Sequence, residues 1–380
     1  RVLAARLADA KFFFEEDRKT KLADRVEKLK GVTFHHKLGT LHQKTGRLTE
    51  LVVKLADMLG GHDLRNTCRR AAQLSKADLL TGMVGEFPTL QGIIGGEYAR
   101  YDGESEEVSR AIAEQYLPRS MDDALPQTLA GKILSLADRL DTLAAFFHVG
   151  IVPTGSEDPL GLRRHATAVV RIIIEGNLRL NLGKAADNAW NIAADDLKLS
   201  APQPSTILLN FIAERLRYYC RTVHGLREDV IEALAKRSDK WMYDLVDVVS
   251  RMKALQSITA RPEFDPLMVG FKRAHRLVEK EQWTGEEIHT ALFQHPTEAE
   301  LHKVVNEARQ LVQVSIKGGD YAKAMDALVR MKPAIDGFFE GVMVNADDPA
   351  LRANRLSLLY AIDQLFLSFA DFSQIVVQGT

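Results

Sequence analysis

The feature that most constrains the fold of this chain is a helical spacing of apolar residues that recurs along its length. Apolar side chains return every three or four residues, which places them on one face of an α-helix. The clearest stripes are Leu48, Leu51, Val52, Leu55 and Leu59; Leu129, Ile133, Leu136, Leu140, Leu143 and Phe147; Leu208, Phe211, Ile212, Leu216 and Tyr219; and Leu358, Leu359, Ile362, Phe366 and Phe369. Because such faces must be buried against one another, the spacing predicts an all-α architecture of packed bundles. Only short apolar bursts such as "VVRIII" at 169–174 are compatible with a strand.

The composition of the chain excludes several classes of protein. The 380 residues are enough for two or three domains, and 50 Lys+Arg are balanced by 51 Asp+Glu, so the chain lacks the overall basic charge of a nonspecific nucleic-acid coat. Cys68 and Cys220 are too few and too far apart for a disulfide framework or a zinc quartet. Apolar runs are far shorter than a membrane span requires. We therefore expect a cytoplasmic protein with no membrane segment.

Loop chemistry marks the expected joints between helical units. Pro combines with Gly, Ser or Asp in "GIVPTGSEDPLG" at 150–161, "SAPQPS" at 200–205 and "TARPEFDP" at 259–266. These joints predict a helical unit ending near 180, a middle stretch to about 260 and a C-terminal bundle. The first residue is Arg1, and no signal peptide follows it, so we expect the chain to be part of a longer one.

Familiar catalytic motifs are absent from the sequence. It contains no Walker loop, no dinucleotide-binding glycine fingerprint, no G-x-S-x-G elbow and no H-E-x-x-H helix. Catalysis by a familiar motif is therefore not visible in the sequence.

One scatter of charged residues resembles the metal site of a helical HD-class phosphohydrolase, which needs two histidines and two aspartates around a cation. Lys44 stands where the first histidine is expected, Asp78 follows an alanine in place of the second, and Asp138 remains as the last ligand. A lysine near buried aspartates favours a structural ion pair over a working metal centre, although the metal site stays an alternative. The pair His62-Asp63 follows two glycines, so Asp63 is predicted to cap a helix, with a metal-ligand role for the pair as the alternative.

Arginines cluster after the 150–161 loop. Arg163, Arg164 and Arg171 lie on one predicted helix, with Arg164 and Arg171 on the same face. They are candidates for phosphate contact, and an ordinary solvated helix face explains them equally well.

Several long strings together resemble the β subunit of the bacterial, heterotetrameric glycyl-tRNA synthetases. They include "RVLAARLADAKFFFEEDRK", "HKLGTLHQKTGRL", "LADRLDTLAAFFHVGIVPTGSEDPLGLRRHATAVVRI" and "FFEGVMVNADDPALRANRLSLL". The resemblance implies an N-terminal remnant over 1–20, a degenerate HD-like helical domain over 21–180, a helical linker over 181–264 and a DALR-like anticodon-binding bundle over 265–380.

The resemblance also implies a function and partners. The chain would be a non-catalytic, tRNA-binding part of glycine-tRNA ligase, with tRNA-Gly and the α subunit as partners in an α2β2 heterotetramer. It would use no cofactor or metal itself and bind no DNA, while the α subunit would use ATP and Mg²⁺ to form glycyl-adenylate. The alternatives are a metal-dependent HD-type phosphohydrolase and a purely structural scaffold for the α subunits.

The segment "VNADDPALRANRLSLL" is the expected tRNA contact. Asn345, Arg352, Asn354 and Arg355 would engage phosphates and base edges of the anticodon stem, and pairing of Arg355 with the aspartates of the helix start is the alternative. Lys44, Asp78 and Asp138 fall where HD hydrolases place metal ligands. Compared with the family pattern, Gly161 and His165 are unusual, and glycine is expected to loosen the local helix.

Overall fold

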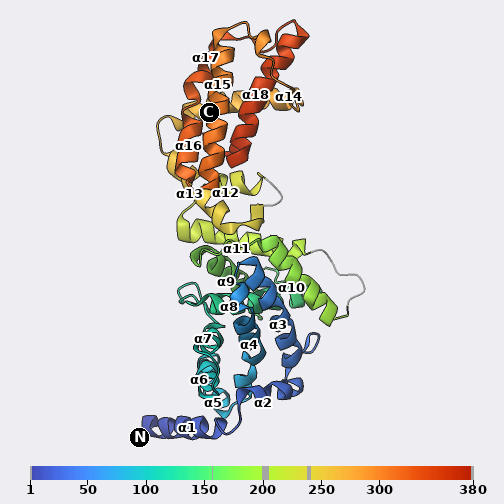
Figure 1. The fold of residues 1–380 in the computed structure, drawn as a ribbon, viewed down its shortest axis with the longest axis vertical. Coiled ribbons are helices and arrows are strands. Elements are labelled where there is room, and N and C mark those ends of the chain that lie inside the picture. The colour runs from blue at the N-terminus through green and yellow to red at the C-terminus, as the bar shows by residue number, and fades with distance from the viewer. Residues whose placement is uncertain (1, 156, 199–204, 238–240, 378–380) are drawn as a thin grey trace. The chain divides into compact units, whose positions relative to one another are not determined.

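The regular secondary structure of the described residues is almost entirely helical (Figure 1). The computed structural model describes residues 2–155, 157–198, 205–237 and 241–377. Contacts divide the chain into a first unit, Arg1–Tyr219 with Met242–Val246, and a second unit, Cys220–Trp241 with Asp247–Thr380. The all-α prediction is confirmed. In the described ranges the strands are β1 (Thr33–His35) and β2 (Gly39–Thr40), which pair antiparallel in a small hairpin.

The first unit is built from the helices that precede Tyr219. They are α1 (Val2–Asp17), α2 (Leu22–Val26), α3 (Leu41–Met58), α4 (Arg65–Leu74), α5 (Gly82–Glu86), α6 (Ile93–Tyr101), α7 (Glu106–Glu114), α8 (Leu129–His148), α9 (Leu162–Glu175), α10 (Leu182–Asp196) and most of α11 (Thr206–His224). Short 3-10 helices lie at Glu27–Gly31, His62–Leu64, Ala77–Leu80, Pro88–Leu90 and Trp241–Tyr243. The 169–174 burst lies within α9, so it is helical.

Helix α8 forms the centre of the first unit. It is buried on almost all sides from Ala130 to Phe147 and packs against α3, α4, α7, α9 and α10. A helix that is apolar around its whole circumference is expected in such a central position. Any charged residue on α8 is therefore held in the core and must find its partners there.

Helix α3 lies beside α8 and is fixed at its start by a capping box. Thr40 accepts a hydrogen bond from the backbone N–H of Gln43, and the Gln43 side chain accepts one from the backbone N–H of Thr40. This arrangement satisfies backbone donors that the first turn of a helix would leave unpaired. It fixes the register that turns Lys44 and Arg47 toward α8, where both are buried.

The second unit is a helical bundle. Its helices are α12 (Glu228–Ala235), α13 (Leu245–Thr259) from Asp247 onward, α14 (Phe264–Lys280), α15 (Pro296–Lys317), α16 (Tyr321–Val329), α17 (Lys332–Gly341) and α18 (Pro349–Phe369), with 3-10 turns at Thr290–Leu292 and Phe372–Gln374. Phe271 and Phe366 stack in its core with ring centroids 4.7 Å apart, and Phe372 packs edge-on against both. Asp348 caps α18 through hydrogen bonds from Ala350 and Leu351 N–H, as the Asp-Asp-Pro sequence predicts.

The stretch expected to be a linker, 181–264, is shared between the two units. Helix α10 packs on α3 and α8, so by its contacts it belongs to the first unit. The joints at 150–161 and 259–266 coincide with breaks between helices, whereas 200–204 of the third joint lie outside the described residues. The expected domain boundaries stay predictions.

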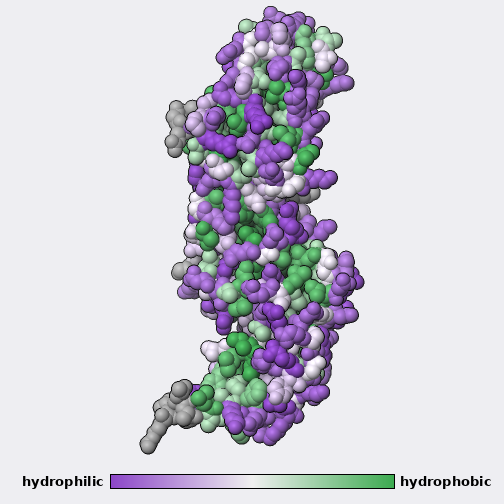
Figure 2. Space-filling model, turned by 60° about the vertical axis from the view of Figure 1, so that its left-hand side comes forward, coloured by the Kyte–Doolittle hydropathy of each residue, from purple (hydrophilic) through white to green (hydrophobic). Residues whose placement is uncertain are grey.

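Hydrophilic residues cover most of the face shown in Figure 2, with hydrophobic patches between them. Within the described ranges no helix combines the length and apolar character that crossing a membrane requires.

Candidate functional site

A buried charge cluster lies where α3 meets α8. The ammonium nitrogen of Lys44 lies 2.9 Å from Asp138 Oδ1 and 2.8 Å from Asp141 Oδ2, and it donates a 2.9 Å hydrogen bond to Thr142 Oγ1. Asp141 and Thr142 follow Asp138 by three and four positions, so each shares with Asp138 the face of α8 that meets Lys44. Lys44, Asp138 and Asp141 are at most 5% exposed.

Two further cations complete the cluster. Lys76 Nζ lies 3.3 Å from Asp138 Oδ2, while Lys44 pairs with the other oxygen of this carboxylate. Arg47, one turn after Lys44, places Nε 2.6 Å from Asp141 Oδ1 and Nη1 2.7 Å from Asp196 Oδ2 on α10. Three cations thus face three carboxylates, and the network joins α3, α8 and α10.

The Asp138 and Asp141 carboxylates of this cluster are charged. Burial alone would raise the pKa of the Asp138 carboxyl, but Lys44 and Lys76 outweigh burial and hold that pKa well below its usual range. The Asp141 carboxyl also keeps a lowered pKa despite its burial, because Lys44 and Arg47 lie beside it. In the described part of the chain, no three His, Cys, Asp or Glu side chains are arranged to hold a metal ion. These residues do not fit the HD-type metal, since the Lys44 ammonium occupies the space between the carboxylates.

Asp78 does not join the cluster, contrary to its expected role as a partner of the lysine. It lies in the 3-10 turn Ala77–Leu80, not within an α-helix, and its Oδ2 accepts a 2.6 Å hydrogen bond from Gly92 N–H. Its Oδ1 is buried and has no hydrogen-bond partner among the described residues. Burial raises the pKa of this carboxyl to about 6. The second carboxylate beside Lys44 is Asp141, which the sequence did not lead us to assign to the site.

The three α9 arginines have different surroundings. Arg171 is buried, with Nε 2.6 Å from Glu175 Oε1 and Nη1 donating to Ser120 O, so it is a structural residue. Arg163 donates to the carbonyl of Gly155 at 2.7 Å. Arg164 is exposed, and no ion pair to it occurs in the described ranges. All three line a small cavity of 110 Å³, where Arg164 remains the best candidate for contact with an anion.

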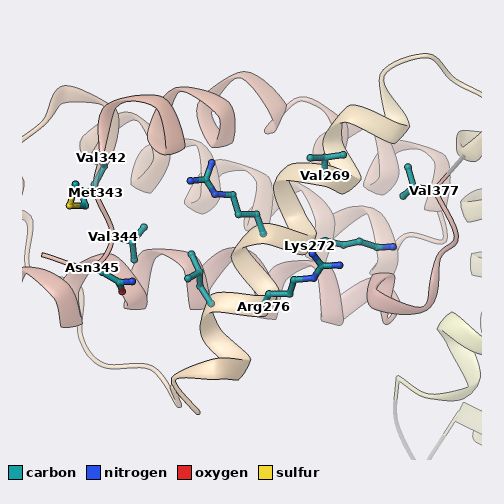
Figure 3. A pocket seen from close by; sticks show the side chains of 10 residues that line it. Val269, Lys272, Arg276, Val342, Met343, Val344, Asn345 and Val377 are labelled. Atoms are coloured by element: carbon teal, nitrogen blue, oxygen red, sulfur yellow. The ribbon is translucent and has the colours of Figure 1, made fainter. Parts of the chain in front are cut away.

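A larger basic pocket lies in the second unit. It has a volume of 640 Å³, and its ten lining residues include three cations and no acid. They are Val269, Lys272, Arg273, Arg276 and Leu277 of α14, the segment Val342, Met343, Val344 and Asn345, and Val377. Figure 3 shows Lys272 and Arg276 on α14, with the 342–345 segment on one side of the view and Val377 on the other.

The three cations of this pocket come from one face of α14, where spacings of three and four residues bring them together. Lys272 Nζ donates to Ile375 O at 2.7 Å, and the Arg273 guanidinium lies 4.2 Å from the ring centroid of Phe339. Arg276 is exposed and has no carboxylate within ion-pair distance in the described residues. The pocket is therefore positively charged with at least one uncompensated guanidinium.

The residues expected to contact tRNA lie near this pocket but mostly serve the fold. Arg355 is buried, with Nε 2.9 Å from Glu298 Oε1, so its partner is Glu298 and not the aspartates of the helix start. Asn354 bridges both backbone groups of His289. Arg352 Nη2 lies 2.6 Å from Glu281 Oε2. Only Asn345 lines the pocket with an exposed side chain.

Sequence reasoning missed Lys272, Arg273 and Arg276. The string "GFKRAHRLVEK" carries the signal, because three cations fall on one helix face beside Val269. The predicted Asp63 cap is wrong: the residue lies inside the 3-10 turn His62–Leu64, and α4 begins without a side-chain cap. Gly161 does not loosen a helix interior, since it precedes α9 with a left-handed φ of 66°.

Comparisons with known proteins match two successive parts of the chain. A family model described as glycyl-tRNA synthetase beta subunit matches residues 1–236, and one described as DALR anticodon binding domain matches 267–370. The chain is 43% identical to the glycine–tRNA ligase beta subunit of Myxococcus xanthus over 99% of its own length and 54% of that protein. The chain is 41% identical to the glycine–tRNA ligase beta subunit of Syntrophus aciditrophicus over 100% of its own length and 54% of that protein. The chain spans about half the length of these relatives, and it belongs to the family of glycyl-tRNA synthetase β subunits.

Proposed function

We propose that this chain is the tRNA-holding part of a glycine–tRNA ligase β subunit and that its second unit receives the anticodon of tRNA-Gly. The DALR match covers α14 from Leu267 and the 342–345 segment, so it includes nearly all of the basic pocket. The relatives carry the name of a ligase subunit, which supports a role in attaching glycine to its tRNA.

The observation that carries the proposal is the composition of this pocket. Lys272, Arg273 and Arg276 provide positive charge, while Val269 and Met343 are 55% and 76% exposed beside them. Single-stranded RNA offers phosphates to cations and unstacked bases to apolar or guanidinium faces. The exposed amide of Asn345 can donate to or accept from a base edge. An anticodon loop presents this combination of groups.

The wider assembly is part of the same proposal. The α subunit would carry the chemistry with ATP and Mg²⁺, and two copies of each subunit would form the enzyme in the cytoplasm. The buried cluster around Lys44 supports a structural role for the first unit, because its ligand set does not fit the cation that an HD-type phosphohydrolase needs.

Salt-dependent binding of tRNA-Gly to the chain tests the proposal. Neutralising Lys272, Arg273 and Arg276 to glutamine should weaken binding and reduce the slope of log affinity against log salt by about 0.7 for each phosphate that the variant no longer neutralises. Lys280→Gln is the matched control, because this exposed lysine lies on the same helix outside the pocket.

An unchanged slope in the triple variant would refute the placement of RNA at this pocket. If the wild-type chain fails to retain tRNA-Gly at low salt, the scaffold alternative replaces the proposal.

A further inference from the structure

Two adjoining cavities open over the charge cluster of the first unit. Their volumes are 350 Å³ and 360 Å³, and both are lined by Tyr116, Asp138 and His165. Each reaches the range of about 300–1,000 Å³ that small-molecule sites occupy. The shared walls make them two halves of one site, which the proposed anticodon function does not use.

The two halves differ in chemistry. One has an apolar wall in which Phe34 and His35 contact Phe146, with ring centroids 5.8 Å and 5.2 Å apart. The other has cations on its wall, including Arg139 and Arg164. An aromatic half beside a cationic half suits a ligand that joins a flat ring to an anionic group.

The cationic half carries positive charge that the protein does not neutralise. Arg139 is buried, and among the described residues its guanidinium donates only to backbone carbonyls, those of Gln115, Ser135, Tyr116 and Pro118. Burial lowers the pKa of Arg139 to about 10, so the group stays charged at neutral pH. Arg164 is exposed and has no ion-pair partner in the described ranges.

The surrounding carboxylates do not cancel this charge. Asp138, Asp141 and Asp196 are matched by Lys44, Lys76 and Arg47 within the cluster, so Arg139 and Arg164 are in excess. Even if the nearby Asp78 is counted as ionised, these side chains together carry one net positive charge.

His165 adds a free polar atom at the junction of the two halves. Its Nδ1 is buried with no hydrogen-bond partner in the described residues. Burial, together with the charge of Arg139, lowers the pKa of His165 to about 4, so the ring is neutral at pH 7 and can donate one hydrogen bond. Gly161 leaves room for the Arg164 guanidinium, because a Cβ at this position would lie 2.6 Å from Arg164 Nη2.

We propose that this cavity binds a phosphate ester of mononucleotide size, with the phosphate against Arg164 and His165, close to the positive charge of Arg139, and the flat ring against Phe34 and Phe146. Arginine donors pair with phosphate oxygens through charge-assisted hydrogen bonds. The site needs no metal, since the Lys44 ammonium lies between the carboxylates below it. The proposal is independent of tRNA binding by the second unit.

Isothermal titration of the intact chain with adenosine monophosphate, adenosine and inorganic phosphate tests the site. The monophosphate should bind with a dissociation constant below about 1 mM, adenosine should bind at least tenfold more weakly, and EDTA should change neither. Arg164→Gln and His165→Ala should each weaken monophosphate binding, about tenfold for the arginine, because each removes a hydrogen-bonding group from the phosphate.

Arg69→Gln is the control, since Arg69 is an exposed arginine of α4 outside the cavity, and its affinity should equal that of the wild type. Thermal unfolding of each variant separates loss of ligand from loss of fold. Equal monophosphate affinity in Arg164→Gln and wild type would overturn the proposal. The proposal would also be overturned if none of the three probes bound, or if the chain bound only a long RNA. Both outcomes count whether or not the second unit binds tRNA.

Discussion

Replacing Lys44 by methionine should destabilise the first unit by about 3 kcal/mol. Methionine preserves most of the apolar stem, so the loss comes from the ammonium. Without it, Asp138 and Asp141 lose ion pairs of 2.9 Å and 2.8 Å in a core where they are at most 5% exposed. Removing one partner of a buried pair typically costs about 3–5 kcal/mol. Lys76 and Arg47 remain beside these carboxylates, which keeps the expected cost near the lower limit.

Urea unfolding followed by circular dichroism gives the free energy of unfolding, and hydrogen exchange in α8 peptides assigns the loss to the first unit. Lys54→Met is the matched control, because Lys54 lies on the same helix in an exposed 3.0 Å pair with Glu50 that should contribute less than about 0.5 kcal/mol. The double variant Lys44→Met with Asp141→Asn should recover at least about 1 kcal/mol, since it removes the carboxylate left in excess and leaves Lys76 with Asp138 and Arg47 with Asp196. A loss below about 1 kcal/mol for Lys44→Met, or no recovery in the double variant, would refute the role assigned to the cluster.

Three further results are expected. Asp78→Asn should stabilise the chain above pH 6 by up to about 3 kcal/mol. The reason is that the folded-state pKa of Asp78, about 6, exceeds the unfolded value of about 3.9, so the stability of the wild type falls as pH rises between these values. A series of urea midpoints against pH that shows the same decline in the variant would contradict this assignment. Asp138 has the opposite pH dependence, because its folded-state pKa is lowered and stabilises the folded chain above the unfolded pKa. This stabilisation is lost as pH falls below about 4, so acid titration followed by circular dichroism should show loss of the first unit. Arg355→Met should destabilise the second unit by about 3 kcal/mol, because it leaves the fully buried Glu298 without its partner. Arg276→Gln should leave the thermal midpoint of the second unit unchanged. Equal midpoints for Arg355→Met and the wild type would show that Arg355 is not held by the fold and is available to RNA.

Helix positions could be predicted from the sequence because burial of apolar faces leaves a three-to-four residue period that is read directly. The stripe ending at Phe147 corresponds to α8, and the Asp-Asp-Pro sequence marks the start of α18. Family membership followed from long matching strings. The two-unit division could not be predicted in the same way, because α10 joins the first unit through contacts with helices far away in the sequence.

Partners of buried charges were harder to predict, because side-chain pairing depends on tertiary packing. Lys44 was expected beside Asp78 and Asp138, but the face of α8 that meets α3 carries Asp141 in addition to Asp138, and Asp78 faces the Gly92 backbone. Arg355 pairs with Glu298, 57 residues earlier in the chain. The α14 cations form a pocket only when the 342–345 segment and Val377 close its sides, which no local pattern reveals.

Photocrosslinking from the basic pocket tests the central claim most directly. A benzophenone side chain in place of Met343, which is 76% exposed at the pocket, should crosslink to anticodon-loop nucleotides of tRNA-Gly. The same group in place of Val314, which is 68% exposed on α15 outside the pocket, should give little product. Equal yields from the two positions, or a crosslink from position 343 to the acceptor stem, would contradict the placement of the anticodon at this pocket.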